Sequence, residues 1–317
     1  MLDNFLFSLN VVVPVFLVMI LGYELKRRDI VTSGFLASGN KIVFYIALPA
    51  LLFRGVYTSD IRAFVDFRFI AFALTCAVAA FFTLWSISAI VIKDKTVRAS
   101  FVQGAFRGSF ALFGIPLLIN LAGDAGMARA ALLVVFVVPF FNVFSIMVLA
   151  PCTGEKLGFW AVIWTVLKNP SNIMIAIGIL LAVLDLSLPV MVSGAINTTA
   201  NLATPLALLC LGGGMAFRGF DTKFKYAIIA SMIKIIVIPL VFTAAAVFFG
   251  FRDYDLAVLM IFFGVPSAVV GYSMAAQMGG DTYVAGTIIV ISTLVSAATL
   301  TIFIYTLRTL GLLAGMA

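Results

Sequence analysis

The sequence predicts an all-α integral membrane protein with ten transmembrane helices in two inverted five-helix repeats. Of its 317 residues, 64% are hydrophobic and 10% are charged, whereas about a quarter of the residues in soluble domains are charged. Ten apolar stretches are each near the roughly 20 residues that cross a bilayer. Two of them contain a Gly-x-Pro string, Gly114-Ile115-Pro116 and Gly264-Val265-Pro266. We expect spans four and nine to break at these prolines.

The first stretch is preceded by Asp3 and followed by Lys26-Arg27-Arg28. A secretory signal has the opposite charge order and a cleavage site. We therefore expect a retained first span whose N-terminus is non-cytoplasmic. The sixth stretch is short, and glycine and proline interrupt the fourth and ninth. In order, the expected spans are Phe5–Leu25, Leu36–Val56, Phe67–Ile92, Ser100–Ala122, Ala125–Ala150, Asn169–Leu186, Val190–Met215, Phe224–Phe249, Leu256–Met278 and Thr282–Leu307.

The Lys and Arg residues agree with this orientation, because cytoplasmic loops carry an excess of them. With both termini on the non-cytoplasmic side, twelve lie in cytoplasmic loops and six in outer loops. The net charge of +7 is spread over these short loops. That dispersion does not favour a nucleic-acid partner, and membrane lipid is the expected surrounding.

The two halves of the chain share short strings. Ala47-Leu48-Pro49 matches Ala203-Thr204-Pro205, and Gly123-Asp124 matches Gly280-Asp281. Each half holds five spans, so the second half enters the membrane from the opposite side, as in many secondary transporters. We expect one membrane domain over residues 1–317. Repeat one covers about 1–150, a loop covers 151–168, and repeat two covers about 169–317.

The predicted helix breaks rest on proline, which lacks a backbone N–H and clashes with the preceding turn. A lone proline in a span more often marks an ordinary kink. Paired breaks at Gly114/Pro116 and Gly264/Pro266 instead favour a substrate site between the halves.

Two cations, Arg107 and Lys234, lie well inside spans, and no Asp or Glu lies at a similar depth. A charged residue inside a membrane is by default a functional candidate. Two cations without a carboxylate predict a site for an anion. The alternative is that both long side chains snorkel to the cytoplasmic surface.

Neutral polar residues near the expected breaks complete the candidate substrate site. A serine in a span more often bonds its own helix, whereas a buried amide is costlier and is the better candidate. This set is Ser109, Asn142, Ser267, Tyr272, Ser273 and Gln277.

The chain has no histidine, and its three cysteines have no metal-ligand spacing. We therefore expect no catalytic residues, no metal site and no cofactor, although carbonyl and hydroxyl oxygens could hold a coupling Na⁺. One alternative is a cation/proton exchanger on a related inverted-repeat fold, which requires Asp at the crossing. Another is an intramembrane enzyme or a sensor, which requires a general acid–base set.

An ordered set of motifs covers nearly the whole chain and resembles the auxin efflux carrier family. That family includes bacterial malonate and malate permeases and plant hormone exporters. The motifs are Asn40–Phe53, Arg107-Gly108-Ser109 running into Gly114-Ile115-Pro116, Lys168-Asn169-Pro170, Thr204–Gly212, and Pro266 through Gly280-Asp281.

The resemblance implies a scaffold of spans 1, 2, 6 and 7 and a transport domain of spans 3–5 and 8–10. It implies that spans 4 and 9 cross at their prolines, where substrate binds, with elevator-like alternating access. The expected substrate is a small organic anion such as malonate, malate or an auxin-like acid, and a homodimer through scaffold helices is expected. The family commonly has Asn where this chain has Ser109. The short central loop favours a permease of the bacterial inner membrane.

Overall fold

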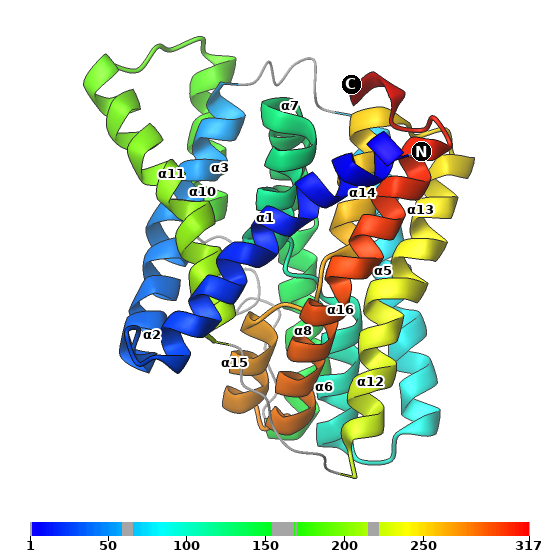
Figure 1. Cartoon of the computed structure of the whole chain (residues 1–317). Helices are drawn as coiled ribbons and strands as arrows, with labels where there is room; N and C mark the ends of the chain where they lie inside the picture. Colours follow the sequence, from blue (N-terminus) through cyan, green and yellow to red (C-terminus); the bar gives the residue numbers. More distant parts are fainter. Residues whose placement is uncertain (1, 59–65, 154–167, 169, 215–221, 317) are drawn as a thin grey trace.

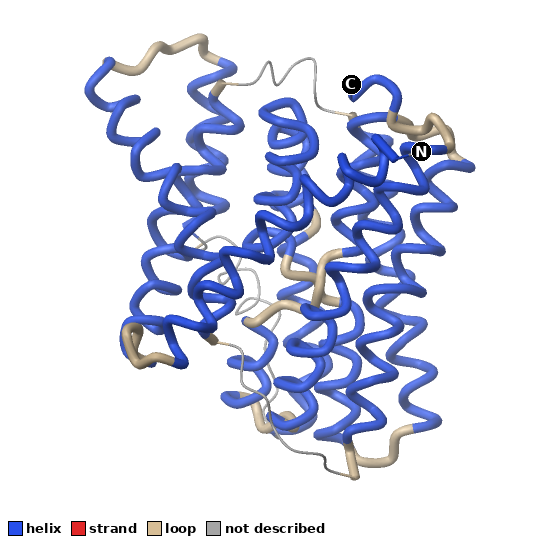
Figure 2. The backbone as a smooth tube through the Cα atoms, viewed as in Figure 1, coloured by secondary structure: helices blue, strands red, loops and turns tan. Residues whose placement is uncertain are grey.

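The computed structural model describes residues 2–58, 66–153, 168, 170–214 and 222–316, and regular secondary structure in these ranges is helical (Figures 1 and 2). Helices lie over each of the ten expected ranges. Among the described residues, five helical runs are long and apolar enough to cross a membrane. The ten crossings and the inverted repeat stay predictions. The five runs are Ser33–Tyr57, Phe67–Val91, Val190–Gly213, Phe224–Phe248 and Thr282–Thr309.

In the first helix group, α2, α3, α10 and α11 lie together on one side of the molecule, and α1 runs from them across to the opposite side (Figure 1). In it, α3 packs on α10 and α11, and α1 crosses α11. A Cβ atom at Gly212 would meet the backbone carbonyl of Met19, and one at Gly22 would meet that of Leu209. The two backbones touch here because both positions are glycine. The group consists of α1 (Leu2–Arg27), α2 (Ser33–Ile42), the π-helical turn η1 (Val43–Ala47), α3 (Leu48–Tyr57), α10 (Pro170–Val183) and α11 (Val190–Gly213).

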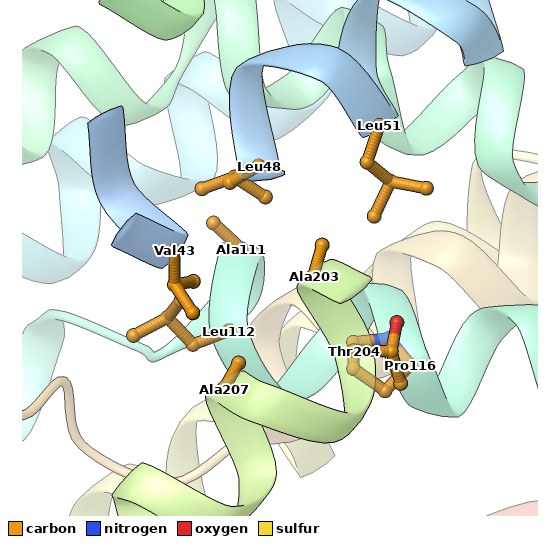
Figure 3. Close-up of a pocket in the computed structure, with 9 residues that line it drawn as sticks. All are labelled: Val43, Leu48, Leu51, Ala111, Leu112, Pro116, Ala203, Thr204 and Ala207. Atoms are coloured by element: carbon orange, nitrogen blue, oxygen red, sulfur yellow. The ribbon is translucent and has the colours of Figure 1, made fainter. Parts of the chain in front are cut away.

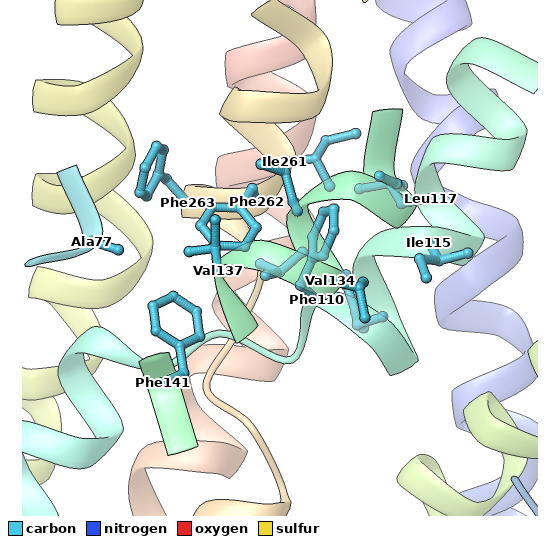
Figure 4. Close-up of a cluster of buried hydrophobic side chains, with 14 of the residues drawn as sticks. Ala77, Phe110, Ile115, Leu117, Val134, Val137, Phe141, Ile261, Phe262 and Phe263 are labelled. Carbon is cyan, nitrogen blue, oxygen red and sulfur yellow. The ribbon is translucent and has the colours of Figure 1, made fainter. Parts of the chain in front are cut away.

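The second helix group surrounds α14, whose residues from Leu256 to Gly264 are all buried. Figure 4 shows its aromatic core, in which Phe262 of α14 lies 4.9 Å from Phe110 and 5.4 Å from Phe141 between ring centroids. The group consists of α5 (Phe67–Val91), α6 (Lys95–Phe106), η2 (Phe110–Gly114), α7 (Ile115–Phe136), α8 (Val138–Thr153), α12 (Phe224–Met232), η3 (Ile233–Val237), α13 (Ile238–Phe248), α14 (Asp253–Gly264), α15 (Val270–Gln277) and α16 (Thr282–Thr309).

Aspartates cap the helices at one end of this group. The side chain of Asp281 accepts from the Val284 N–H at the start of α16, and Asp94 caps α6. The Thr96 hydroxyl donates to the Asp94 carboxylate, which holds the pKa of that carboxyl below its ordinary value. These caps satisfy N–H groups that the first helical turn leaves unpaired.

Three prolines follow π-helical turns instead of breaking their helices. The residue before each proline donates its N–H five residues back, as Ile115 does to Phe110 before Pro116. The wider turn moves away the carbonyl that the proline ring would otherwise meet. The other two pairs are Leu48 to Val43 before Pro49 and Ile238 to Ile233 before Pro239.

The predicted position of the first helix break is therefore wrong. Gly114 and Pro116 lie in the helical elements η2 and α7. The backbone leaves the helix seven residues earlier, at Arg107–Ser109, where Arg107 has φ −89° and ψ 113°. The second break does lie at a Gly-x-Pro string: α14 ends at Gly264, and Val265–Val269, with Pro266 inside, is not helical.

Helix starts show why the two strings do not correspond. α5 and α12 begin at Phe67 and Phe224, 157 residues apart, and Gly123 and Gly280 are separated by the same interval. The two Gly-x-Pro strings are 150 residues apart and lie outside this register.

Candidate functional site

The two helix breaks pair with each other in the interior. The Ser109 N–H donates to the Pro266 carbonyl at 2.7 Å, and the Ala268 N–H donates to the Arg107 carbonyl at 3.1 Å. This places Gly108 opposite Ser267 in an antiparallel bridge. N–H and C=O groups that lose their helical partners at one break thus form hydrogen bonds with the other break. Unpaired backbone groups would be costly in an interior without water.

Gly108 is needed for this approach. A Cβ atom there would lie 2.8 Å from Cγ2 of Val265 and 3.1 Å from Nζ of Lys234. The first distance is shorter than carbon atoms tolerate, so a side chain at this position would push the breaks apart.

A cavity of about 110 Å³ lies beside the paired breaks. Its volume is several times the roughly 10–15 Å³ of cavity space that one water needs, so it has room for a small solute. Both breaks, η1, α3 and α8 contribute to its wall. The lining residues are Phe44, Leu48, Arg107, Gly108, Ser109, Phe110, Ala111, Leu112, Phe141, Asn142, Ala268, Val269 and Val270.

Next to this cavity, η2 and α7 meet α11 along a close-packed seam (Figure 3). Ala111 and Leu112 face Ala203 and Ala207 of α11 there, with Pro116 and Thr204 beside them. The seam is one of the places where the second helix group touches the first, because α1 of the first group also packs on α7 and α16 of the second.

Arg107 supplies the charge of the cavity wall and is only 7% exposed. Its guanidinium donates to Oδ1 of Asn142 at 2.7 Å, Oγ of Ser145 at 3.1 Å and Sδ of Met274 at 3.3 Å. Among the described residues no carboxylate forms an ion pair with it. Since these partners are neutral and a guanidinium stays protonated, the positive charge is not cancelled.

The first residues of two helices lie in the wall of the same cavity. η2 begins at Phe110 and α15 begins at Val270, and residues of both first turns line the wall. First-turn N–H groups have no partner within their helix, and the helix dipole makes this end positive. With Arg107, the arrangement can bind an anion.

Lys234 is not in the cavity wall. It lies in η3, is 1% exposed, and its Nζ donates to the Phe263 carbonyl at 2.7 Å. Gly108 separates it from the cavity. Neither Lys234 nor Arg107 snorkels to a surface.

The other predicted residues divide into three sets. Ser109 and Asn142 line the cavity with Arg107. Ser267 lies in the second break, where its N–H donates to Oγ of Ser292, and it is not part of the lining. Tyr272 lies on α15 with its ring toward Gly286, also outside the lining. The side chains of Ser273 and Gln277 lie outside the described part of the structure.

Sequence reasoning missed Ser145 and Met274 as partners of Arg107. Ser145 follows Asn142 by one helical turn and therefore shares its face, a spacing that could have revealed it. Met274 also accepts a contact from Gln103 at 3.6 Å. A methionine carries no polar signal in the sequence.

Comparison with known proteins places the chain among transporters. The sequence profile of a family described as "Membrane transport protein" matches residues 7–157 and 159–304. An uncharacterized transporter of Methanothermobacter thermautotrophicus is 21% identical over 93% of this chain and 97% of its own length. The uncharacterized transporter YfdV of Escherichia coli is 22% identical over 95% and 98%. A protein of Rhizobium meliloti named putative malonate transporter is 26% identical over 94% and 95%.

Proposed function

The chain belongs to the membrane transport protein family, and from this premise we propose that it is a secondary carrier for a small organic anion in the bacterial inner membrane. The family match confirms the resemblance to auxin efflux carriers drawn from the ordered motifs. The relatives reported above carry transporter names, and one is named a putative malonate transporter.

The observation that carries the proposal is the setting of Arg107. Its charge is buried, its partners are neutral, and two helices begin in the wall of the same cavity. A carboxylate can accept two parallel hydrogen bonds from a guanidinium. Ser109 and Asn142 are placed to orient the remaining polar groups of the anion.

The cavity of about 110 Å³ has room for an acid of the size of malonate or malate. The apolar walls from Phe44, Phe110 and Phe141 suit the short carbon chain between two carboxylates.

For alternating access, we infer an elevator-like shift of the second helix group along the first. The seam supports this, because all its lining residues except Thr204 are apolar, so a shift along it would break few polar contacts. The apolar outer faces of α10 and α11 are the proposed contact between two copies of the chain.

Ligand-induced thermal stabilisation of the purified protein tests the anion site. We expect small dicarboxylates to raise the melting temperature by mass action, by about 2.7 kcal/mol of stability at one hundred times the dissociation constant. Neutral and cationic compounds of equal size are expected to leave it unchanged.

Two variants test the role of Arg107. Arg107→Ala is expected to lose the stabilisation and the uptake of anion into proteoliposomes, because the charge that binds the carboxylate is gone. Arg98→Ala is the control. Arg98 lies on α6, nine residues before Arg107, and this variant is expected to keep both the stabilisation and the uptake. Wild-type uptake in Arg107→Ala would remove Arg107 from the site.

The alternatives predict different results. A cation/proton exchanger would be stabilised by cations, which the buried positive charges of Arg107 and Lys234 disfavour. An intramembrane enzyme would turn over a substrate, and its product would appear in a screen of the purified protein.

A further inference from the structure

Lys234 is the one candidate residue whose charge the anion cavity leaves unexplained. It lies in the π-helical turn η3, and its side chain is 1% exposed. Its Nζ donates to the carbonyl of Phe263 at 2.7 Å. Among the described residues, no carboxylate pairs with it.

The carbonyl that accepts this hydrogen bond lies at the C-terminal end of α14. Phe263 lies in the last turn of α14, which ends at Gly264 just before the second break. The last carbonyls of a helix have no partner within it and form its negative end. In transporters with broken helices, such C-terminal ends and unwound carbonyls coordinate the coupling cation.

The same ammonium also lies beside the first break. A Cβ atom at Gly108 would lie 3.1 Å from Nζ and 3.3 Å from Cε of Lys234. The positive group therefore donates a hydrogen bond to the last turn of α14 and lies next to Gly108 of the first break. A coupling cation at the end of α14 would compete for the same carbonyl.

We propose that the Lys234 ammonium is a built-in cation of this carrier, occupying the place of a coupling metal ion, so that anion binding at Arg107 requires no Na⁺. The proposal rests on the function proposed above, since it describes how that anion site is supported. It makes Lys234 a positioning residue that holds the end of α14 against Gly108.

The first experiment compares the wild-type protein in chloride salts of Na⁺, K⁺ and N-methyl-D-glucamine at equal ionic strength, without any anion substrate. The expected result is the same melting temperature in all three salts. A specific stabilisation by Na⁺ would overturn the proposal, because it would show a metal site that Lys234 does not fill.

The second experiment removes the ammonium and supplies a substitute. Lys234→Ala is expected to melt about 5 °C lower, because a hydrogen bond from a charged group is lost. Methylammonium is expected to restore part of this loss, and tetramethylammonium, which cannot donate a hydrogen bond, is expected to restore none. Equal melting with both amines would overturn the proposal.

Further variants separate charge from structure. Lys234→Arg keeps a cation and is expected to retain anion binding, whereas Lys234→Met has a similar length, lacks the charge and is expected to lose it. Lys225→Ala, on the exposed part of the same helical run, is the control. Wild-type stability and anion binding in Lys234→Met would overturn the proposal, and if that variant does not fold, the salt comparison on wild type decides.

These results are independent of the anion proposal. The salt and amine measurements contain no carboxylate, so they read the Lys234 site even if no organic acid binds at Arg107. Loss of carboxylate stabilisation with unchanged salt results would count against the proposed substrate and leave the built-in cation in place.

Discussion

Arg107 is held by an amide, a hydroxyl and a thioether rather than by a carboxylate. These neutral acceptors hold the guanidinium in one place while the cavity is empty, and they leave its charge available to an anion. The thioether of Met274 is the weakest acceptor of the three. When an anion binds, the Arg107 N–H that donates to Met274 is therefore expected to donate to a carboxylate oxygen instead, because this replaces the weakest of the three acceptors.

Met274→Leu keeps the apolar volume and removes the sulfur acceptor. The empty protein is expected to lose about 1 kcal/mol of stability, because one N–H of Arg107 loses its partner. Anion affinity is expected to rise by up to roughly fivefold, since the empty state is the one that is weakened. Thermal melting with and without a dicarboxylate measures both effects, and Met278→Leu is the control. A fall in affinity would mean that Met274 contacts the anion itself.

The candidate site was predictable where its residues share one helix break. Arg107 and Ser109 lie in the first break, and Asn142 on α8 lies beside them in the cavity wall. Their expected depth within the membrane spans was therefore enough to group them. Depth says nothing about direction around a helix, however. Lys234 lies at a comparable depth to Arg107, yet it points to the far side of Gly108. Lys234 lies in the π turn η3, and no pattern in the sequence identifies that turn.

Among the elements, the contrast between Pro116 and Pro266 shows that proline alone does not determine a helix break. Pro116 follows a π turn and stays in a continuous helical run, whereas Pro266 lies in extended backbone. The first break forms instead at Gly108, where the backbone of the second break approaches. That approach joins residues from the two halves of the chain, so only the folded structure reveals it.

Substitution at the two positions separates these roles. Gly108→Ala is expected to destabilise the protein by about 2 kcal/mol, because its Cβ would overlap the Val265 side chain. It is also expected to abolish carboxylate binding by displacing Arg107 and Ser109. Pro116→Ala, the matched comparison, is expected to change stability by less than about 1 kcal/mol. Thermal melting and ligand-induced stabilisation measure both variants, and the reverse order would place the functional break at Pro116.

The crossing of α1 and α11 makes a second prediction at this scale. Gly212→Ala is expected to destabilise the protein by about 3 kcal/mol, since its Cβ would meet the Met19 carbonyl and force the helices apart. Gly194→Ala on the same helix has no atom within 4 Å of the added Cβ. It is expected to be neutral or slightly stabilising, because alanine favours the helix. Equal melting temperatures for the two variants would contradict the close crossing.

For the molecule as a whole, the composition and the length of the apolar stretches predicted the helices. A helix that crosses the hydrocarbon core must be apolar over about 20 residues. The division into two groups follows from contacts between segments far apart in the chain, such as α3 with α10 and α6 with α16. The resemblance to a known family, rather than periodicity, suggested that division. The seam between the groups is apolar and lies directly beside the anion cavity (Figure 3).

Cross-linking across the seam tests the proposed motion. Cysteines at Leu112 and Ala207, joined by a short bis-maleimide in a variant lacking the three native cysteines, are expected to stop uptake while carboxylate binding changes less than about twofold. A disulfide inside the first group is the control: Val56 and Gly178 have Cβ positions 3.6 Å apart, which suits a disulfide between cysteines at these two positions. This control is expected to leave uptake unchanged. Full uptake with the seam linked would exclude a sliding mechanism.

The bridge between Gly108 and Ser267 has a consequence for biosynthesis. Its two halves are separated by roughly 160 residues, which a ribosome adds in about 10 to 30 s. During that interval Arg107–Ser109 have been synthesised, while the carbonyl of Pro266 that receives the Ser109 N–H has not. A first break that forms in this interval has unpaired backbone groups that hydrocarbon does not satisfy. It must wait in a hydrated or protein-lined setting until the second half arrives, and this delay is set by the length of the chain between its two breaks.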